Sequence, residues 1–162
     1  MELKHPILDH DIDRAKATDY EKAVERVMAM DEAELLSFVP EYGFASCCEC
    51  PSCYGGVQGN GVFSWSIDRP DELRCRYCGA VPYPNQDYVE AHDLVGQNVL
   101  GEEIRLPYYL NADRNIPHFF SMHLQQYRRG WLLEQCIALG KAYQVTGNEA
   151  YARLPVLILD RL

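Results

Sequence analysis

The fold is decided by residues 50–79, which read CPSCYGGVQGNGVFSWSIDRPDELRCRYCG. Each end of this segment carries a C-x-x-C pair, Cys50 with Cys53 and Cys75 with Cys78. A spacing of two residues lets one tight turn aim both sulfurs at a single ion, and two facing turns form the closed Cys₄ tetrahedron of structural zinc. The spacing therefore predicts a zinc ribbon whose Zn²⁺ stabilises the fold and leaves no coordination position for a substrate.

The other cysteines leave one alternative open in the ligand set. Cys47 and Cys50 also form a C-x-x-C pair, so Cys47 or Cys48 can replace a ribbon ligand. We prefer Cys53, because Pro51 and the glycines after Cys53 suit the tight turn. The chain has 7 cysteines, and an odd count fits a full disulfide framework poorly. Cys136 falls on the apolar face of a predicted helix and is expected to lie in the core.

The segments around the ribbon predict helices. Thr18 and Glu21 fit a capping box at the start of one helix, and Asp31 caps a second short helix that Pro40 would stop. Apolar residues recur at helical spacing over 119–143, and a second helix follows over 149–162 after a break at Gly147. Residues 62–67 alternate as in a strand, whereas 85–117 read as a long irregular stretch.

Together these patterns predict a mainly α chain with a small β zinc ribbon. We expect a helical lead-in over 1–45, the Cys₄ ribbon over 46–84, and over 85–162 a linker followed by an αα-hairpin. The last helix keeps its apolar face as far as Leu162, so we expect the chain to be the N-terminal piece of a longer protein.

Composition restricts the class of protein. The 162 residues are 48% hydrophobic and 24% charged, which is typical of a soluble globular chain. No apolar run approaches the roughly 20 residues that span a bilayer, and the start lacks the apolar stretch of a secretory signal. The net charge of −9 argues against nucleic acid as a partner, because phosphate binding needs clustered Lys and Arg.

One segment, residues 111–129, is locally basic within this acidic chain. Arginine binds carboxylates or sulfates through parallel hydrogen bonds, and histidine and tyrosine are suited to proton transfer. Its candidate substrate-binding residues are Arg114, His118, His123, Tyr127 and Arg128. The alternative is that the histidines and Tyr127 cap or pack against a helix, with the arginines solvated.

The helical hairpin resembles a known family. Ala142-Tyr143, Thr146-Gly147-Asn148 and Tyr151-Ala152 resemble the first helix pair of the incomplete α/α toroid in heparinase II/III-like polysaccharide lyases. The early His5-Pro6-Ile7-Leu8 is similar to the lead-in of that family, some bacterial members of which carry a cysteine-rich insertion before the toroid.

The resemblance implies that the full enzyme cleaves an acidic polysaccharide by β-elimination. The family's catalytic Tyr and His come from later toroid helices and a following β-sandwich, so they match no position here. We therefore expect this chain alone to be inactive, with its catalytic residues unknown. The resemblance does not identify the polysaccharide.

Two other functions stay open. One is a zinc-ribbon interaction module fused to a helical domain, and the other is a different α/α-toroid enzyme, such as a glycoside hydrolase or epimerase. The ribbon segment holds three arginines against four acids, which disfavours nucleic acid. A reduced thiolate site and the absence of a signal favour the cytoplasm by default, or the periplasm or secretion if the N-terminus is incomplete.

Overall fold

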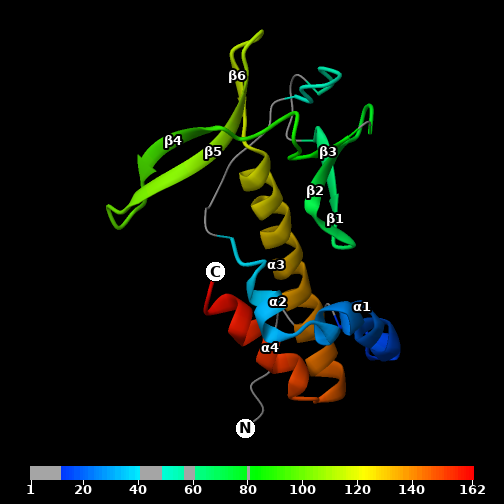
Figure 1. Cartoon of the computed structure of the whole chain (residues 1–162). Coiled ribbons are helices and arrows are strands. Elements are labelled where there is room, and N and C mark those ends of the chain that lie inside the picture. The colour runs from blue at the N-terminus through cyan, green and yellow to red at the C-terminus, as the bar shows by residue number, and fades with distance from the viewer. Residues whose placement is uncertain (1–11, 41–48, 57–60, 80) are drawn as a thin grey trace. The chain divides into compact units, whose positions relative to one another are not determined.

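The computed structural model describes residues 12–40, 49–56, 61–79 and 81–162, and it divides into two compact units. The described residues of the helical unit fall within Met1–Val39 and Arg129–Leu162. Those of the ribbon unit fall within Pro40–Arg128. Helix α3 (Phe120–Thr146) starts in the ribbon unit and ends in the helical unit, as Figure 1 shows.

The helical unit combines a 3-10 turn (Arg14–Lys16) with α1 (Ala17–Ala29), α2 (Glu32–Leu36), the second part of α3, and α4 (Ala150–Leu159). Phe38 meets Trp131 edge-on, with ring centroids 5.8 Å apart. The buried apolar side chains of this unit are Val24, Val27, Leu35, Phe38, Leu132, Leu139, Ala142 and Ile158. Cys136, expected in this core, is half-buried.

The helix ends test the capping predictions. The Asp31 carboxylate accepts a 2.8 Å hydrogen bond from the Glu34 amide, and Gly147 ends α3 with a φ of 70°, so both signals are confirmed. The prediction of a capping box at Thr18 is wrong. The 3-10 turn runs directly into α1 at Ala17, so Thr18 already lies inside the helix.

The ribbon unit is built on an antiparallel sheet in the order β1–β2–β3, formed by Phe63–Ser66, Arg69–Cys75 and Pro82–Tyr83. The first turns of α3 supply Phe120 and Leu124 to its core. These pack with Phe63, Leu73 and Tyr83, whose side chains are fully buried. The ribbon is thus closed by apolar packing on one side and by its cysteine turns at one end.

A second antiparallel sheet occupies most of the segment expected to be irregular. It consists of β4 (His92–Gln97), β5 (Glu103–Asn111) and β6 (Ile116–His118), in that order. The described residues are 42% helix and 24% strand, so the prediction of a mainly α fold is wrong. Alternating Ile104, Leu106 and Tyr108 are a strand signal that Pro107 concealed. Among the described residues, the half of β5 that contains Pro107 pairs only with β4. Because the other edge of this half is unpaired within the described part of the chain, a proline, which has no backbone N–H to donate, is accommodated there.

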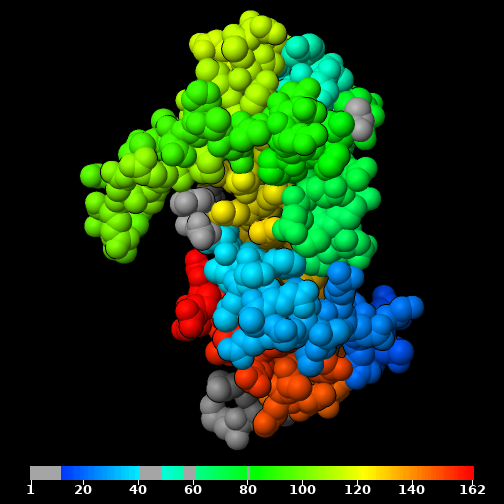
Figure 2. Space-filling model, viewed as in Figure 1, coloured from blue at the N-terminus to red at the C-terminus, as the bar shows by residue number. Residues whose placement is uncertain are grey.

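Strands β4 and β5 form a projecting arm, visible in Figures 1 and 2. The strand register places Leu94 opposite Leu106 and Gly96 opposite Ile104 on one face, which is apolar. The other face carries Arg105, which pairs with both Asp93 and Glu103. The arm is therefore amphipathic.

Candidate metal centre

The first cysteine turn closes through backbone hydrogen bonds around Cys50. The Tyr54 amide donates to the Cys50 carbonyl at 2.8 Å, and the Cys50 amide donates to the Gly55 carbonyl at 3.0 Å. Tyr54 adopts a φ of 55°, in the left-handed region. This turn brings the Cys50 and Cys53 thiols to one side of the loop.

The second turn repeats the first around Cys75. The Gly79 amide donates to the Cys75 carbonyl at 3.0 Å, and Gly79 has a φ of 57°. The Tyr77 amide donates to Cys75 Sγ at 3.3 Å, the kind of contact that stabilises a thiolate. The two turns therefore share one local conformation, with Tyr54 in the first at the position that Gly79 occupies in the second.

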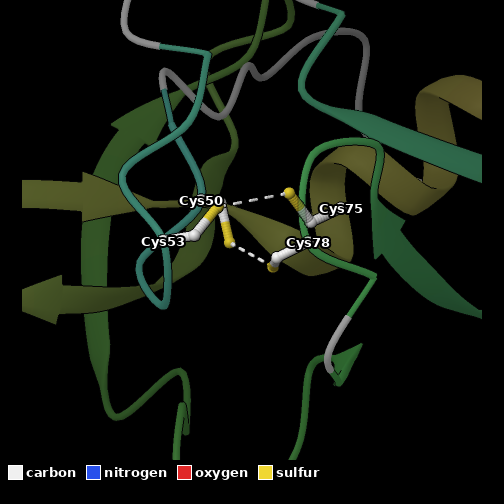
Figure 3. Close-up of side chains that lie close together, drawn as sticks. All are labelled: Cys50, Cys53, Cys75 and Cys78. Carbon is white, nitrogen blue, oxygen red and sulfur yellow. Dashed lines mark hydrogen bonds between the residues drawn. The ribbon is translucent and has the colours of Figure 1, made fainter.

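The four sulfurs have the spacing of a tetrahedral site. Cys50 Sγ lies 3.9 Å from Cys78 Sγ, Cys53 Sγ lies 3.7 Å from Cys75 Sγ, and all four sulfurs lie within 4.8 Å of one another (Figure 3). A Zn–S bond of about 2.3 Å in a tetrahedron places the sulfurs about 3.8 Å apart. The thiols are free rather than joined as disulfides. The four side chains fit a metal ion such as zinc.

Burial differs between the members of each pair. Cys50 and Cys75 are buried and belong to the apolar core, whereas Cys53 and Cys78 are exposed. The site therefore lies at the end of the core, with one thiol of each turn reaching the surface.

The thiols hold their protons unequally. Burial raises the pKa of Cys75, but the amides of Cys78 and Tyr77 and the neighbouring thiols outweigh it and lower that pKa to about 7. Desolvation and then the neighbouring thiols raise the pKa of Cys53 to about 12, against a lowering contribution from the Gly55 amide. Cys75 therefore forms a thiolate near neutral pH, whereas Cys53 keeps its proton, so four thiolates together need a bound cation.

A hydrogen-bonded layer supports the first turn from inside. Tyr83 is fully buried, and its hydroxyl lies 3.3 Å from Cys50 Sγ and also contacts the Ser52 hydroxyl. Ser52 donates to the Tyr88 hydroxyl at 3.0 Å. Burial and the Cys50 thiol raise the pKa of Tyr83, so its neutral hydroxyl is available to donate to the sulfur.

The turn between β5 and β6 contacts the first cysteine turn through Arg114. Its Nη1 lies 2.9 Å from Glu49 Oε2, and its guanidinium lies 5.1 Å from the centre of the Tyr54 ring. The Glu49 side chain is 1% exposed, so the carboxylate of this ion pair is buried. Arg114, a candidate substrate residue, is thereby placed beside the cysteine site.

His118 and His123, two further candidates, are both buried. The His118 ring stacks on Phe120 at 5.7 Å, and burial lowers its pKa to about 4 despite the raising influence of the Glu49 backbone. His123 packs edge-on against Phe63 and Tyr127. Both imidazoles are thus part of the aromatic packing of the ribbon unit.

Tyr127 and Arg128 contact the ribbon. The Tyr127 hydroxyl donates to the Phe63 carbonyl at 2.6 Å, and its ring stacks on Trp65. Arg128 donates to the Pro70 carbonyl at 3.1 Å and pairs with Asp71. Within the described residues, these side chains attach the start of α3 to the first sheet, and their role in substrate binding stays a prediction.

Sequence reasoning did not single out Glu49, Tyr83 or Tyr54. Glu49 and Tyr54 flank the first C-x-x-C pair, and this position beside the predicted ligands is the sequence feature that could have indicated their place at the site. Their partner Arg114 lies far along the chain, and local pattern does not predict such contacts. The competing Cys47 and Cys48 lie outside the described residues.

No helix in the described part of the chain is long and apolar enough to cross a membrane. No family model matches the chain, and neither the search of curated proteins nor that of solved structures found a match.

Proposed function

We propose that Cys50, Cys53, Cys75 and Cys78 hold one structural zinc ion. The observation that supports this most directly is the sulfur spacing of 3.7 and 3.9 Å, which matches the edge of a Zn–S tetrahedron. Four thiolates complete the coordination, so the ion binds no substrate. Because Cys50 and Cys75 are also core residues, metal binding contributes directly to folding of the ribbon unit.

Metal analysis tests this proposal. The purified chain is expected to contain about one zinc per molecule, and Co²⁺ substitution should give the visible spectrum of a tetrahedral thiolate site. The Cys75→Ser/Cys78→Ser double variant should lose the metal, whereas Cys136→Ser is the matched control and should keep it. Unchanged metal content in the double variant would disprove the ligand assignment.

We also propose that the chain is the N-terminal part of a heparinase II/III-like lyase acting on an acidic polysaccharide. The support is the resemblance of the α3–α4 hairpin, together with its exposed apolar side chains. Ile137 is 61% exposed on α3, and Val156 and Leu159 are 70% and 57% exposed on α4. Further toroid helices of a longer protein would cover such a surface.

The sequence downstream in the gene tests the lyase proposal. More helical hairpins followed by a β-rich region are expected, and the full-length product should generate unsaturated uronic acid, detected by ultraviolet absorbance on a panel of acidic polysaccharides. A stop codon directly after Leu162, or no absorbance change on any polymer, would contradict the proposal. A zinc-ribbon interaction module or another toroid enzyme would then be favoured.

A further inference from the structure

Each of the two cysteine turns carries an exposed tyrosine side chain. The Tyr54 and Tyr77 side chains are 44% and 65% exposed, and neither belongs to the core of the ribbon unit. Tyr54 follows Cys53 and Tyr77 precedes Cys78, so a bound metal would fix the backbone beneath both rings.

The backbone of the first turn does not require a tyrosine at position 54. Gly79 occupies the equivalent position of the second turn with nearly the same φ, 57° against 55°. Glycine adopts this left-handed conformation without steric cost, whereas a side chain makes it strained. A strained position that carries a large exposed ring points to a role for the ring itself.

The second ring is seated on glycine backbone. A Cβ added at Gly55 would lie 2.7 Å from Cγ of Tyr77, and one added at Gly56 would lie 3.2 Å from its Cε2. Only glycine at position 55 lets the Tyr77 ring rest there without displacement. Gly55 directly follows Tyr54, so the Tyr77 side chain packs on the loop that carries the first ring.

Arg114 braces the first ring. Its guanidinium lies 5.1 Å from the centre of the Tyr54 ring, and the buried Glu49 carboxylate holds it at 2.9 Å. A guanidinium carries five N–H donors, and the Nη1 group is the one that contacts Glu49. The Tyr54 ring therefore lies next to a positioned hydrogen-bond donor.

We propose that Tyr54 and Tyr77 form a stacking platform for the pyranose rings of a polysaccharide, with Arg114 donating to a sugar hydroxyl or carboxylate. The polarised C–H groups of a sugar ring complement the negative face of an aromatic ring, and a fixed tyrosine loses little entropy on binding. This inference rests on the proposed lyase function and names where the substrate chain would be held.

Nucleic acid bases also stack on aromatic rings, but the charges of the ribbon are unfavourable for binding along a phosphate backbone. Arg69 and Arg74 both pair with Glu72, and the whole chain carries a charge of −9. Single-strand binding relies on a positively charged groove as well as on stacking. Stacking on a pyranose ring needs no continuous positive groove, and Arg114 supplies one positioned cation for a sugar carboxylate, so we expect binding to fall less steeply with salt than single-strand binding does.

Binding of the zinc-loaded chain to soluble alginate, polygalacturonate, hyaluronan and heparin tests the platform, by affinity electrophoresis followed by calorimetry. At least one polymer should bind, and Tyr77→Ala should weaken that binding roughly tenfold. Tyr54→Gly should weaken binding similarly while leaving the melting temperature unchanged or raised, because it relieves the strained backbone. Tyr143→Ala removes a ring of the helical unit that is 40% exposed and should change nothing.

Each other outcome overturns the platform. These are no binding to any of the four polymers, unchanged binding in Tyr54→Gly and Tyr77→Ala, or tighter binding to single-stranded DNA than to sugar. Failure of the lyase proposal is distinguishable, because binding is measured without turnover. A full-length protein that lacks elimination activity but loses polymer binding on Tyr77→Ala would keep the platform and reject the lyase.

Discussion

At the scale of single residues, Gly55 has a steric role that a nearby glycine lacks. A Cβ at Gly55 would lie within 2.9 Å of three atoms of Tyr77, whereas one at Gly61 meets nothing within 4 Å. Gly55→Ala must displace the Tyr77 side chain or the turn, and is expected to lower the free energy of unfolding by about 1–3 kcal/mol. Gly61→Ala, in the same unit, should have little effect. Denaturant unfolding of both variants checks this, and equal effects would contradict it.

His118 should make stability depend on pH. Its pKa in the folded protein is lowered to about 4, from an unfolded value near 6.5, because burial disfavours the charged ring. Below pH 6.5, His118 is therefore protonated in the unfolded chain but stays neutral in the folded chain until the pH approaches 4. The contribution of neutral His118 to the free energy of unfolding is fully present above pH 6.5. It is lost as pH falls towards 4, by about 3 kcal/mol in total.

His118→Phe separates this effect from protonation of the thiols. A phenyl ring can keep the stacking on Phe120, and it carries no group that titrates. The free energy of unfolding of the variant should fall less steeply between pH 6.5 and 4 than that of the wild type. Parallel curves in this window would show that His118 does not titrate as expected.

At the scale of elements, the buried Glu49–Arg114 pair links the β5–β6 turn to the first cysteine turn. Arg114→Met keeps an apolar stem near Tyr54 but leaves the Glu49 carboxylate, 1% exposed, without its charged partner. Loss of one member of a buried pair is costly, and since Arg114 is itself 37% exposed we expect a loss of about 2–3 kcal/mol.

Arg105→Met is the matched control on the neighbouring arm. Arg105 pairs with Glu103 at 2.7 Å, but both side chains are more than half exposed, so its replacement should change stability little. Thermal unfolding of the two variants gives the comparison. If Arg105→Met costs as much as Arg114→Met, burial of Glu49 does not determine the strength of the pair.

These elements also show how far sequence reasoning extends. Local signals predicted what is local: the C-x-x-C spacing brought the four sulfurs together, Asp31 capped α2, and Gly147 ended α3. The second sheet was missed because Pro107 interrupts the alternation of β5.

The partners of Arg114 and Tyr127 depend on contacts between distant segments. Glu49 lies far from Arg114 in sequence, and Phe63 lies far from Tyr127. The basic segment is locally rich in cations, yet the fold uses Arg114 and Arg128 in internal ion pairs. Composition alone does not distinguish an arginine that forms an ion pair within the chain from one that binds a substrate.

At the scale of the whole molecule, a metal bound at the four cysteines would act on one of the two units. Cys50 and Cys75 belong to the core cluster of the ribbon unit, together with Phe63, Leu73 and Phe120. The helical unit has its own buried set, which includes Val27, Leu139 and Ile158. Loss of the metal would leave the cysteines of the first core without the ion that links them and would leave the packing of the second unchanged.

Metal removal should therefore loosen the chain selectively. With a chelator, or in the Cys75→Ser/Cys78→Ser variant, amide hydrogen exchange should accelerate in β1, β2 and the first turns of α3. Protection in α1, α4 and the later turns of α3 should persist, because those helices pack in the helical unit. Hydrogen-exchange mass spectrometry with and without zinc measures both regions at once. Equal loss of protection in both units, or no loss in β2, would contradict a structural metal confined to the ribbon unit.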